Sequence, residues 1–333
     1  MTAVLATSDG AGLEIETLPA MPGLAGLYAK GAASSGLIAA GRALPAIPGL
    51  GSGTPAAEDG ALTLPGVVHR VANVPTAGLR THLRDYQRLL HEPVSELLPA
   101  GYLHVLAFPL ATSVMVRGDF PLPLLGMVHL ANDASLLRPV TLGDVLEVRA
   151  WAERLRPHRR GVQLDVVAEI RVGDEVAWRG ASTYLARGFE VPDDSADPAG
   201  TAGSAGSAVE DRAPAGTWAP PLPTGRWALA GGTGRAYAAI SGDRNPIHLS
   251  ALSAKAFGFP RAIAHGMYTA ARALAEVGPG HGTTYRWTVE FGKPVLLPGT
   301  VDVAITPSDD GFAYVGWNAG RRLRHFTGAV TPL

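Results

Sequence analysis

An acid precedes a histidine by five residues in the stretch SGDRNPIHLS (241–250). A carboxylate and an imidazole in contact are a common pair for moving protons near neutral pH. Asp243 and His248 are therefore candidates for the addition or removal of water. The same letters are also ordinary turn chemistry, because Asn and Pro favour the start of a helix. Spacing alone leaves a purely structural role open.

The Asn245-Pro246 pair predicts where this helix begins. Asn is among the best N-caps, and Pro is favoured at the first helical position. We expect one helix from Pro246 that stops at Gly258, with His248 third in it and Asp243 on the preceding turn. In a continuous helix a five-residue separation turns two side chains about 140° apart, so the turn must fold Asp243 back. The positive helix end favours a neutral His248.

A second helix is expected within AHGMYTAARALAEVGPG (264–280), which begins near Gly266. Its first N–H groups lack partners within the helix, and a glycine lets a ligand come close to the backbone. The Gly266 amide is thus a candidate for stabilising a carbonyl oxygen that gains negative charge. A metal site formed by Asp243, His248 and His265 is conceivable, but the spacing matches no zinc signature, and we expect no metal.

The chain that positions these residues has 333 residues, which suggests two domains. Residues 191–216 contain no aromatic residue and almost nothing large and apolar, so we expect a flexible linker. The linker separates a body at 61–190 from a body at 217–333. Residues 1–60 are rich in Ala, Gly and Pro, and we expect a loosely ordered arm.

The two bodies resemble each other. LLRPVTLGDVLEVRAW (136–151) matches FGKPVLLPGTVDVAIT (291–306), and FPLPLLGMVHLA (120–131) matches FPRAIAHGMYTA (259–270) with one residue's offset. In both bodies helical patterns come first and alternating strands follow. The pattern predicts two α+β bodies with mostly antiparallel sheets, produced by duplication.

Composition limits the function classes. The formal net charge is −1, which gives no global field for nucleic acid or an anionic membrane. No uninterrupted apolar run reaches the roughly 18 residues of a membrane span. The first residues lack a basic segment followed by an apolar one, so we expect no secretory signal. Without cysteine the chain has no disulfide or thiolate nucleophile. We expect a cytoplasmic protein that binds neither nucleic acid nor membrane.

A resemblance extends this interpretation. YAAISGDRNPIH (237–248), followed by GFPRAIAHGM (258–267) and FGKPVLLPG (291–299), resembles the hydratase 2 motif of MaoC-like (R)-specific enoyl-CoA hydratases and dehydratases. The first body, with LPAGYLHVLAFPLATSVM (98–115), resembles the non-catalytic half of two-domain bacterial members. The resemblance implies a double hot-dog fold, in which each half is a long helix wrapped by an antiparallel sheet.

The resemblance also implies roles. Asp243 and His248 would activate water for addition to a trans-2-enoyl thioester of coenzyme A or acyl carrier protein, giving a (3R)-hydroxyacyl thioester. Asn245 would fix the loop, and the Gly266 amide would hold the thioester oxygen. No cofactor is required. The expected substrate-binding residues are Ser241, Gly242, Arg261, His265, Met267 and Lys293. Some relatives have a serine further along the long helix, where this chain has Ala271 and Leu274.

The first body lacks this apparatus, since Leu125-Gly126-Met127 stands where the second has His265-Gly266-Met267. We therefore expect one active site per chain, either in a monomer whose halves replace the usual dimer or in a homodimer. Two other functions stay open: a hot-dog acyl-CoA thioesterase, which does not require the Asp-x-Asn-Pro-x-His loop, and a non-catalytic subunit that binds acyl thioesters.

Overall fold

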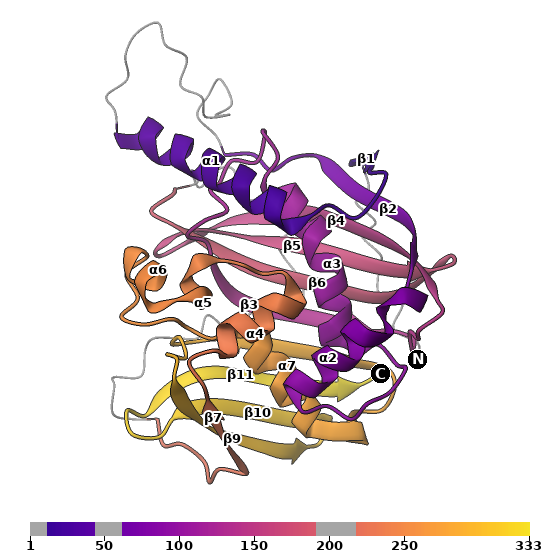
Figure 1. Ribbon diagram of the computed structural model, residues 1–333, viewed down its shortest axis with the longest axis vertical. Helices are drawn as coiled ribbons and strands as arrows, with labels where there is room; N and C mark the ends of the chain where they lie inside the picture. Colours follow the sequence, from indigo (N-terminus) through magenta and orange to yellow (C-terminus); the bar gives the residue numbers. More distant parts are fainter. Residues whose placement is uncertain (1–11, 44–61, 191–217) are drawn as a thin grey trace, which may run out of the picture.

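The computed structural model describes residues 12–43, 62–190 and 218–333 (Figure 1). The predicted linker at 191–216 lies outside these residues. The first half contains β2 (Val67–Pro75), η1 (Ala77–Leu79), α2 (Arg80–Leu90), α3 (Ala100–Met115), β3 (Val128–Leu136), β4 (Val145–His158), β5 (Gly161–Val172) and β6 (Glu175–Arg187). The second half contains β7 (Gly225–Leu229), α4 (Thr233–Ser241), α5 (Pro246–Leu249), α6 (Ala251–Ala256), α7 (Gly266–Val277), η4 (Gly278–His281), β8 (Tyr285–Phe291), β9 (Gly299–Ser308), β10 (Gly311–Asn318) and β11 (Leu323–Pro332).

All strands of the described segments form one sheet, in the order β1-β2-β4-β5-β6-β3-β8-β11-β10-β9-β7. The halves meet where β3 runs antiparallel to β8, with Ala131 opposite Glu290 and Leu136 opposite Tyr285. Outward from this seam the first half reads β3-β6-β5-β4-β2, and the second reads β8-β11-β10-β9-β7. The two orders are the same when each strand is matched by its place in its own half, which is the arrangement that duplication produces.

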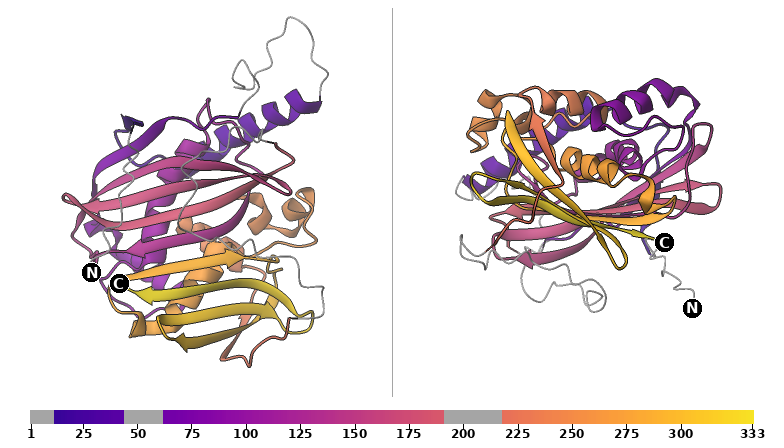
Figure 2. Two further views of the ribbon diagram at one scale, coloured as in Figure 1. Left: turned by 180° about the vertical axis from the view of Figure 1, so that it is seen from behind. Right: turned by 90° about the horizontal axis from the view of Figure 1, so that it is seen from below.

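The helices cover one face of the sheet (Figure 2). The helix α3 is apolar on nearly every side, and twelve of its sixteen residues are buried. An all-round apolar helix is expected where a helix is enclosed by its own sheet and by neighbouring helices. The helix α7 is the counterpart in the second half, and its buried small residues include Ala270, Ala271 and Ala273. A double hot-dog fold of the α+β class is therefore confirmed. Within the described residues, no helix has both the length and the apolar character needed to span a bilayer.

The N-terminal segment differs from the loosely ordered arm predicted for residues 1–60. Within it, β1 (Glu14–Thr17) pairs in parallel with β2, and α1 (Leu24–Ala43) lies on the helical face of the sheet. The glycines of α1 argued against a stable helix, because each costs about 1 kcal/mol relative to Ala. Close contacts offset that cost: a Cβ at Gly31 would lie 3.2 Å from Val116 and collide with Leu124. Residues 1–11 and 44–61 lie outside the described residues.

One of the two internal matches fits the structure, because Val140 and Val295 accept equivalent backbone hydrogen bonds, and the other does not. The Leu98 amide donates to the Val140 carbonyl at 2.8 Å, and the Ala264 amide donates to the Val295 carbonyl at 2.9 Å. These equivalent bonds place Pro99 where the second half has His265. The match of Leu125-Gly126-Met127 to His265-Gly266-Met267 was wrong, because residues 125–127 follow α3 and lead into β3.

Candidate active site

The loop between α4 and α5 carries Asp243, and the first turn of α5 carries His248. The helix α4 ends at Gly242, which has φ +72°, and a Cβ there would collide with Leu24. The Asn245 side chain accepts a hydrogen bond from the Ile247 amide at 3.4 Å, and Pro246 is the first residue of α5. The predicted cap and the third helical position of His248 are thus confirmed.

The predicted single helix up to Gly258 was wrong. The helix α5 ends at Leu249, because Ser250 adopts extended backbone angles (φ −151°, ψ 160°). Its hydroxyl then accepts from the Ser253 amide at 3.0 Å and starts α6. Serine is a favoured N-cap, so the break has a local cause. The chain therefore changes direction at Ser250, two residues after His248.

Hydrogen bonds hold Asp243 through one of its carboxylate oxygens and through its backbone. Its Oδ1 accepts hydrogen bonds from the Tyr28 hydroxyl and from the Asn245 amide, the latter at 3.1 Å. The Asp243 amide donates to the Ser241 hydroxyl at 3.2 Å. The other oxygen, Oδ2, lies 3.7 Å from Nε2 of His265. This pattern fixes the carboxylate plane and leaves Oδ2 as the oxygen with room for a substrate-side partner.

The tautomer of His248 follows from its hydrogen bond. Nδ1 lies 2.9 Å from the Ile263 carbonyl. A carbonyl only accepts, so Nδ1 is the donor and carries the proton of the neutral ring. Nε2 therefore has the lone pair. The ring is buried, and its Nε2 lone pair is the part of the ring that can accept a proton.

His265 lies directly against His248. The two ring centroids are 3.6 Å apart and the planes are inclined by 24°. Nε2 of His265 donates to the Asp243 carbonyl at 3.0 Å, while its buried Nδ1 has no hydrogen-bond partner in the described part of the chain. His265, predicted to bind substrate, is therefore placed to hold the Asp243 loop and to pack on the His248 ring.

Burial and neighbouring charges set the protonation of the three groups. Burial lowers the pKa of His248 and outweighs the opposing effect of Asp243. Burial, assisted by His248, lowers the pKa of His265 to about 3. For Asp243, burial raises the pKa, but the facing imidazoles of His265 and His248 and the bonds from Tyr28 and Asn245 lower it by more. Near neutral pH the cluster is one carboxylate beside two uncharged rings.

The same three residues form a cluster of metal-ligand type. One ligand atom of each lies within 4.8 Å of the others. Two of the four ring nitrogens, Nδ1 of His248 and Nε2 of His265, already donate to backbone carbonyls, and Oδ1 of Asp243 already accepts two hydrogen bonds. This arrangement suits proton transfer better than a closed coordination shell, in which several free lone pairs must converge on one ion.

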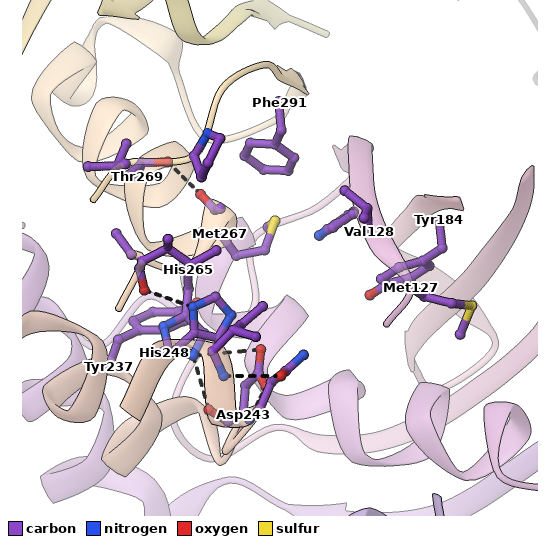
Figure 3. Close-up of a pocket in the computed structure, with 18 of the residues that line it drawn as sticks. Met127, Val128, Tyr184, Tyr237, Asp243, His248, His265, Met267, Thr269 and Phe291 are labelled. Carbon is purple, nitrogen blue, oxygen red and sulfur yellow. Dashed lines mark hydrogen bonds and ion pairs between the residues drawn. The ribbon is translucent and has the colours of Figure 1, made fainter. Parts of the chain in front are cut away.

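A cavity of about 300 Å³ opens beside the cluster and is lined by both halves and by α1. Asp243, His248 and His265 form one wall, and Met127, Val128 and Tyr184 lie across from them (Figure 3). Gly266, the first residue of α7, also lines the cavity. Its amide donates no hydrogen bond within the described part of the chain, as expected for the first turn of a helix. A Cβ at this position would lie 2.9 Å from the Phe291 ring.

The other residues predicted to bind substrate divide into two groups. Ser241, Met267 and Lys293 line the cavity, with Lys293 exposed to solvent. Gly242 and Arg261 do not line it. Gly242 closes α4 against Leu24, and Arg261 donates to the Pro298 carbonyl at 3.1 Å.

Several lining residues were not found from the sequence. Tyr28 comes from α1, 215 residues before Asp243. The first half supplies His104, His129 and Tyr184, and also Arg187, an exposed cation at the end of β6. His129 stacks on Tyr184 with centroids 4.7 Å apart, and its Nε2 has no partner among the described residues. No local motif marks these residues, because their role depends on the pairing of the two halves.

The first half retains part of the outline of this site. The helix α2 ends at His91 in the left-handed conformation (φ 59°), as α4 ends at Gly242. The next residue is Glu92, which matches the position of Asp243, and burial raises its pKa to about 7. The Ala100 amide, which matches that of Gly266, donates to the Tyr285 hydroxyl at 3.3 Å. The amide that would hold a substrate oxygen is thus occupied by the protein itself.

Comparisons with known proteins agree with this geometry. The family model described as MaoC like domain matches residues 228–312. The 3-hydroxyacyl-thioester dehydratase X of Mycobacterium tuberculosis is 35% identical over 238 residues, which cover 71% of this chain and 79% of that protein. A 3-hydroxybutyryl-CoA dehydratase of Methylorubrum extorquens is 44% identical over 73 residues, which cover 21% of this chain and 46% of that protein.

Solved structures give the same result. A crystal structure of HtdX from Mycobacterium tuberculosis has a TM-score of 0.67 and 31% identity, and the match covers 80% of this chain and 100% of that one. A structure described as a MaoC-like dehydratase shares the fold, with a TM-score of 0.59 and 16% identity over 80% of this chain and 97% of that one. The chain belongs to the MaoC-like dehydratase family.

Proposed function

We propose that this hydro-lyase catalyses the reversible hydration of trans-2-enoyl thioesters to (3R)-hydroxyacyl thioesters. The observation that carries the proposal is the convergence of three groups on one cavity. These are a carboxylate oxygen of Asp243, the free Nε2 of His248 and the amide of Gly266. The names of the related dehydratases support the reaction class.

The protonation states restrict how water adds. With Asp243 ionised and His248 neutral, neither group holds an acidic proton to give to the substrate at neutral pH. Water between Oδ2 and Nε2 donates a hydrogen bond to each. One group accepts a proton as the water oxygen attacks Cβ of the enoyl chain, and the electron pair of the double bond moves toward Cα and the thioester carbonyl. The same proton then passes to Cα, which restores the pair.

This sequence balances with water as the only added reagent. The hydroxyl and the proton both reach the enoyl chain from the face on which Asp243 and His248 lie. We therefore expect addition on one face and a single configuration at C3. Dehydration is the reverse path. The sharing of one proton between two coupled groups means that the pair titrates as a unit.

The carbonyl oxygen carries the charge that develops at the transition state. The Gly266 amide lies at the positive end of α7, where a helix stabilises an anion. An oriented N–H donor aimed at a developing oxyanion is typically worth a factor of about 100 to 1,000 in rate. No cofactor takes part in this scheme, because the thioester itself accepts the electron pair.

The substrate is proposed to be an acyl group attached to coenzyme A or to acyl carrier protein. Apolar lining residues such as Phe108, Met115 and Leu124 from the first half suit an acyl chain. The exposed cations Arg187 and Lys293 suit the phosphate groups of either carrier. Since both halves line the cavity, one chain supplies the whole site.

The experiment is a hydration assay with crotonyl-CoA. We expect the conjugated enoyl absorbance to fall without release of free thiol, and chiral analysis to give the (3R) product. Asp243→Asn and His248→Gln should each reduce kcat by about 1,000-fold or more, since the acid–base step is lost, with unchanged circular dichroism. Thiol release would instead indicate a thioesterase. Wild-type rates in both variants would refute the assigned pair.

A further inference from the structure

The helix α1 joins both halves above the cavity. Leu24, Tyr28, Gly31 and Ser35 recur at the spacing that places residues on one face of a helix. Leu24 contacts Gly242, and Tyr28 contacts Asp243, both in the second half. Gly31 packs on Leu124 of the first half, and the Ser35 hydroxyl accepts from the Leu125 amide at 3.2 Å.

Tyr28 is the member of this face that reaches the reacting groups. Its ring lines the cavity and its hydroxyl donates to Oδ1 of Asp243. Burial and the negative charge of Asp243 raise the pKa of Tyr28 far above its usual range. The hydroxyl therefore keeps its proton and acts only as a donor.

The Tyr28 hydrogen bond occupies one carboxylate oxygen of Asp243 and leaves the other for water. Oδ1 also accepts from the Asn245 amide, so two donors converge on the same atom, one from α1 and one from the loop that carries Asp243. With Oδ1 occupied, the carboxylate plane is fixed and Oδ2 remains for water. A hydrogen bond to an ionised group is shorter and about twice as strong as a neutral one, which suits a group that must be held during each turnover.

We propose that Tyr28 is a positioning residue for the hydration reaction, and that docking of α1 completes the catalytic site. This proposal rests on the proposed function. It assigns a role in catalysis to a segment that lies outside both hot-dog halves. Tyr28 does not exchange a proton with the substrate; it acts through Asp243.

The test is Tyr28→Phe in the full chain, which keeps the ring and removes only the donor. We expect kcat for crotonyl-CoA hydration to fall by about 10- to 100-fold, the range for losing a hydrogen bond to a charged group. KM should stay within about twofold, because the acyl-thioester contacts are retained. The melting temperature should change little, since Leu24, Gly31 and Ser35 still hold α1.

The matched control is Tyr268→Phe. Its hydroxyl accepts from Arg272 at 3.2 Å and does not line the cavity, so kcat should stay at the wild-type value. A Tyr28→Phe protein with wild-type kcat, or one that loses activity only in proportion to its folded fraction, overturns the positioning role. An inactive wild-type protein overturns the proposed function instead, so the two failures are distinguishable.

Discussion

The imidazole of His248 lies face to face with that of His265, with ring centroids 3.6 Å apart. Two such rings cannot both be charged at this distance in a buried site without strong repulsion. Burial, assisted by His248, lowers the pKa of His265 to about 3, so this ring stays uncharged at neutral pH. We therefore propose that His248 is the ring that changes its protonation during turnover and that His265 supports it.

The first prediction concerns the pH dependence of the rate. His248 must be neutral to accept a proton, and burial lowers its pKa below the usual 6.5. The acidic limb of kcat/KM should therefore lie below about pH 6.5, with a plateau at neutral pH. The measurement is crotonyl-CoA hydration from about pH 4.5 to about pH 9, within the range where the fold is stable. A half-maximal rate at or above pH 6.5 would contradict the depressed pKa.

Stability should also depend on pH. Burial lowers the pKa of His104 to about 4, and burial lowers those of His129 and His265 to about 3. The unfolded chain binds these protons near pH 6.5, whereas the folded chain resists them. The stability that the three uncharged histidines contribute is therefore fully present above about pH 6.5. It is lost as the pH falls toward about 4 for His104 and about 3 for His129 and His265.

Urea unfolding at several pH values measures this effect. The free energy of unfolding should decrease as the pH is lowered below about 6.5. His104→Leu should reduce the slope of this free energy against pH by the equivalent of about one proton. His91→Gln, at an exposed site, is the control for the replacement of a histidine as such. A slope that His104→Leu does not alter would show that His104 is charged in the folded protein.

The two adjacent helix caps offer a matched pair of variants. Asn245→Ala removes the cap of α5, and Ser250→Ala removes the cap of α6. Each should cost about 1 kcal/mol in the free energy of unfolding. Only Asn245→Ala should also lower kcat, because the loop that carries Asp243 is then less fixed. Equal rate losses in the two variants would mean that α6, too, controls the pair.

Crowding at Gly266 can be compared with equal crowding elsewhere. Gly266→Ala places a Cβ 2.9 Å from the Phe291 ring at the cavity, and Gly280→Ala places one 2.9 Å from the Phe312 ring. Both should destabilise the fold by about 1 to 3 kcal/mol. Gly266→Ala should in addition lower kcat/KM by about tenfold or more, since the substrate oxygen is displaced from the amide. Steady-state kinetics at matched folded fractions checks this, and equal kcat/KM in the two variants would exclude the amide from the reaction.

The cations at the rim should affect binding more than chemistry. Lys293→Gln and Arg187→Gln should each raise KM for crotonyl-CoA several-fold, with kcat nearly unchanged, because exposed charges contribute modest attraction to phosphate. The increase should shrink at high salt. Lys255→Gln is the control, since Lys255 is exposed but outside the cavity lining. A fall in kcat with constant KM would place Lys293 in a different role.

Local chemistry explains what could be predicted from the sequence. Asn245 and Pro246 define a helix start by their own backbone preferences, so the position of His248 followed from a few neighbouring letters. The helix break was missed, although Ser250 has the same capping preference as Asn245 and could have revealed it. A continuous helix was the simpler prediction. The Ile263 amide donates to the Ile247 carbonyl at 3.1 Å, and this contact between separate segments cannot be predicted from local sequence.

Contacts between distant segments explain what could not be predicted. Tyr28 reaches Asp243 across 215 residues, and its helix contains glycines that weaken any local prediction. The match of Leu125-Gly126-Met127 to His265-Gly266-Met267 failed for a related reason. Gly-Met occurs at 126–127 and at 266–267 by coincidence, whereas the equivalent bonds of Leu98 and Ala264 depend on strands that pair only in the folded protein.

Fusion of the two halves along β3 and β8 has a consequence for how such a chain can change. In a dimer of identical subunits every substitution appears twice, so a tyrosine that filled one oxyanion pocket would fill both. A single polypeptide removes that symmetry, and here the Tyr285 hydroxyl occupies the amide of Ala100 but not the equivalent amide of Gly266. Under the proposed function, the first half is then free of catalytic constraint and can be selected for the shape that it gives to the substrate cavity.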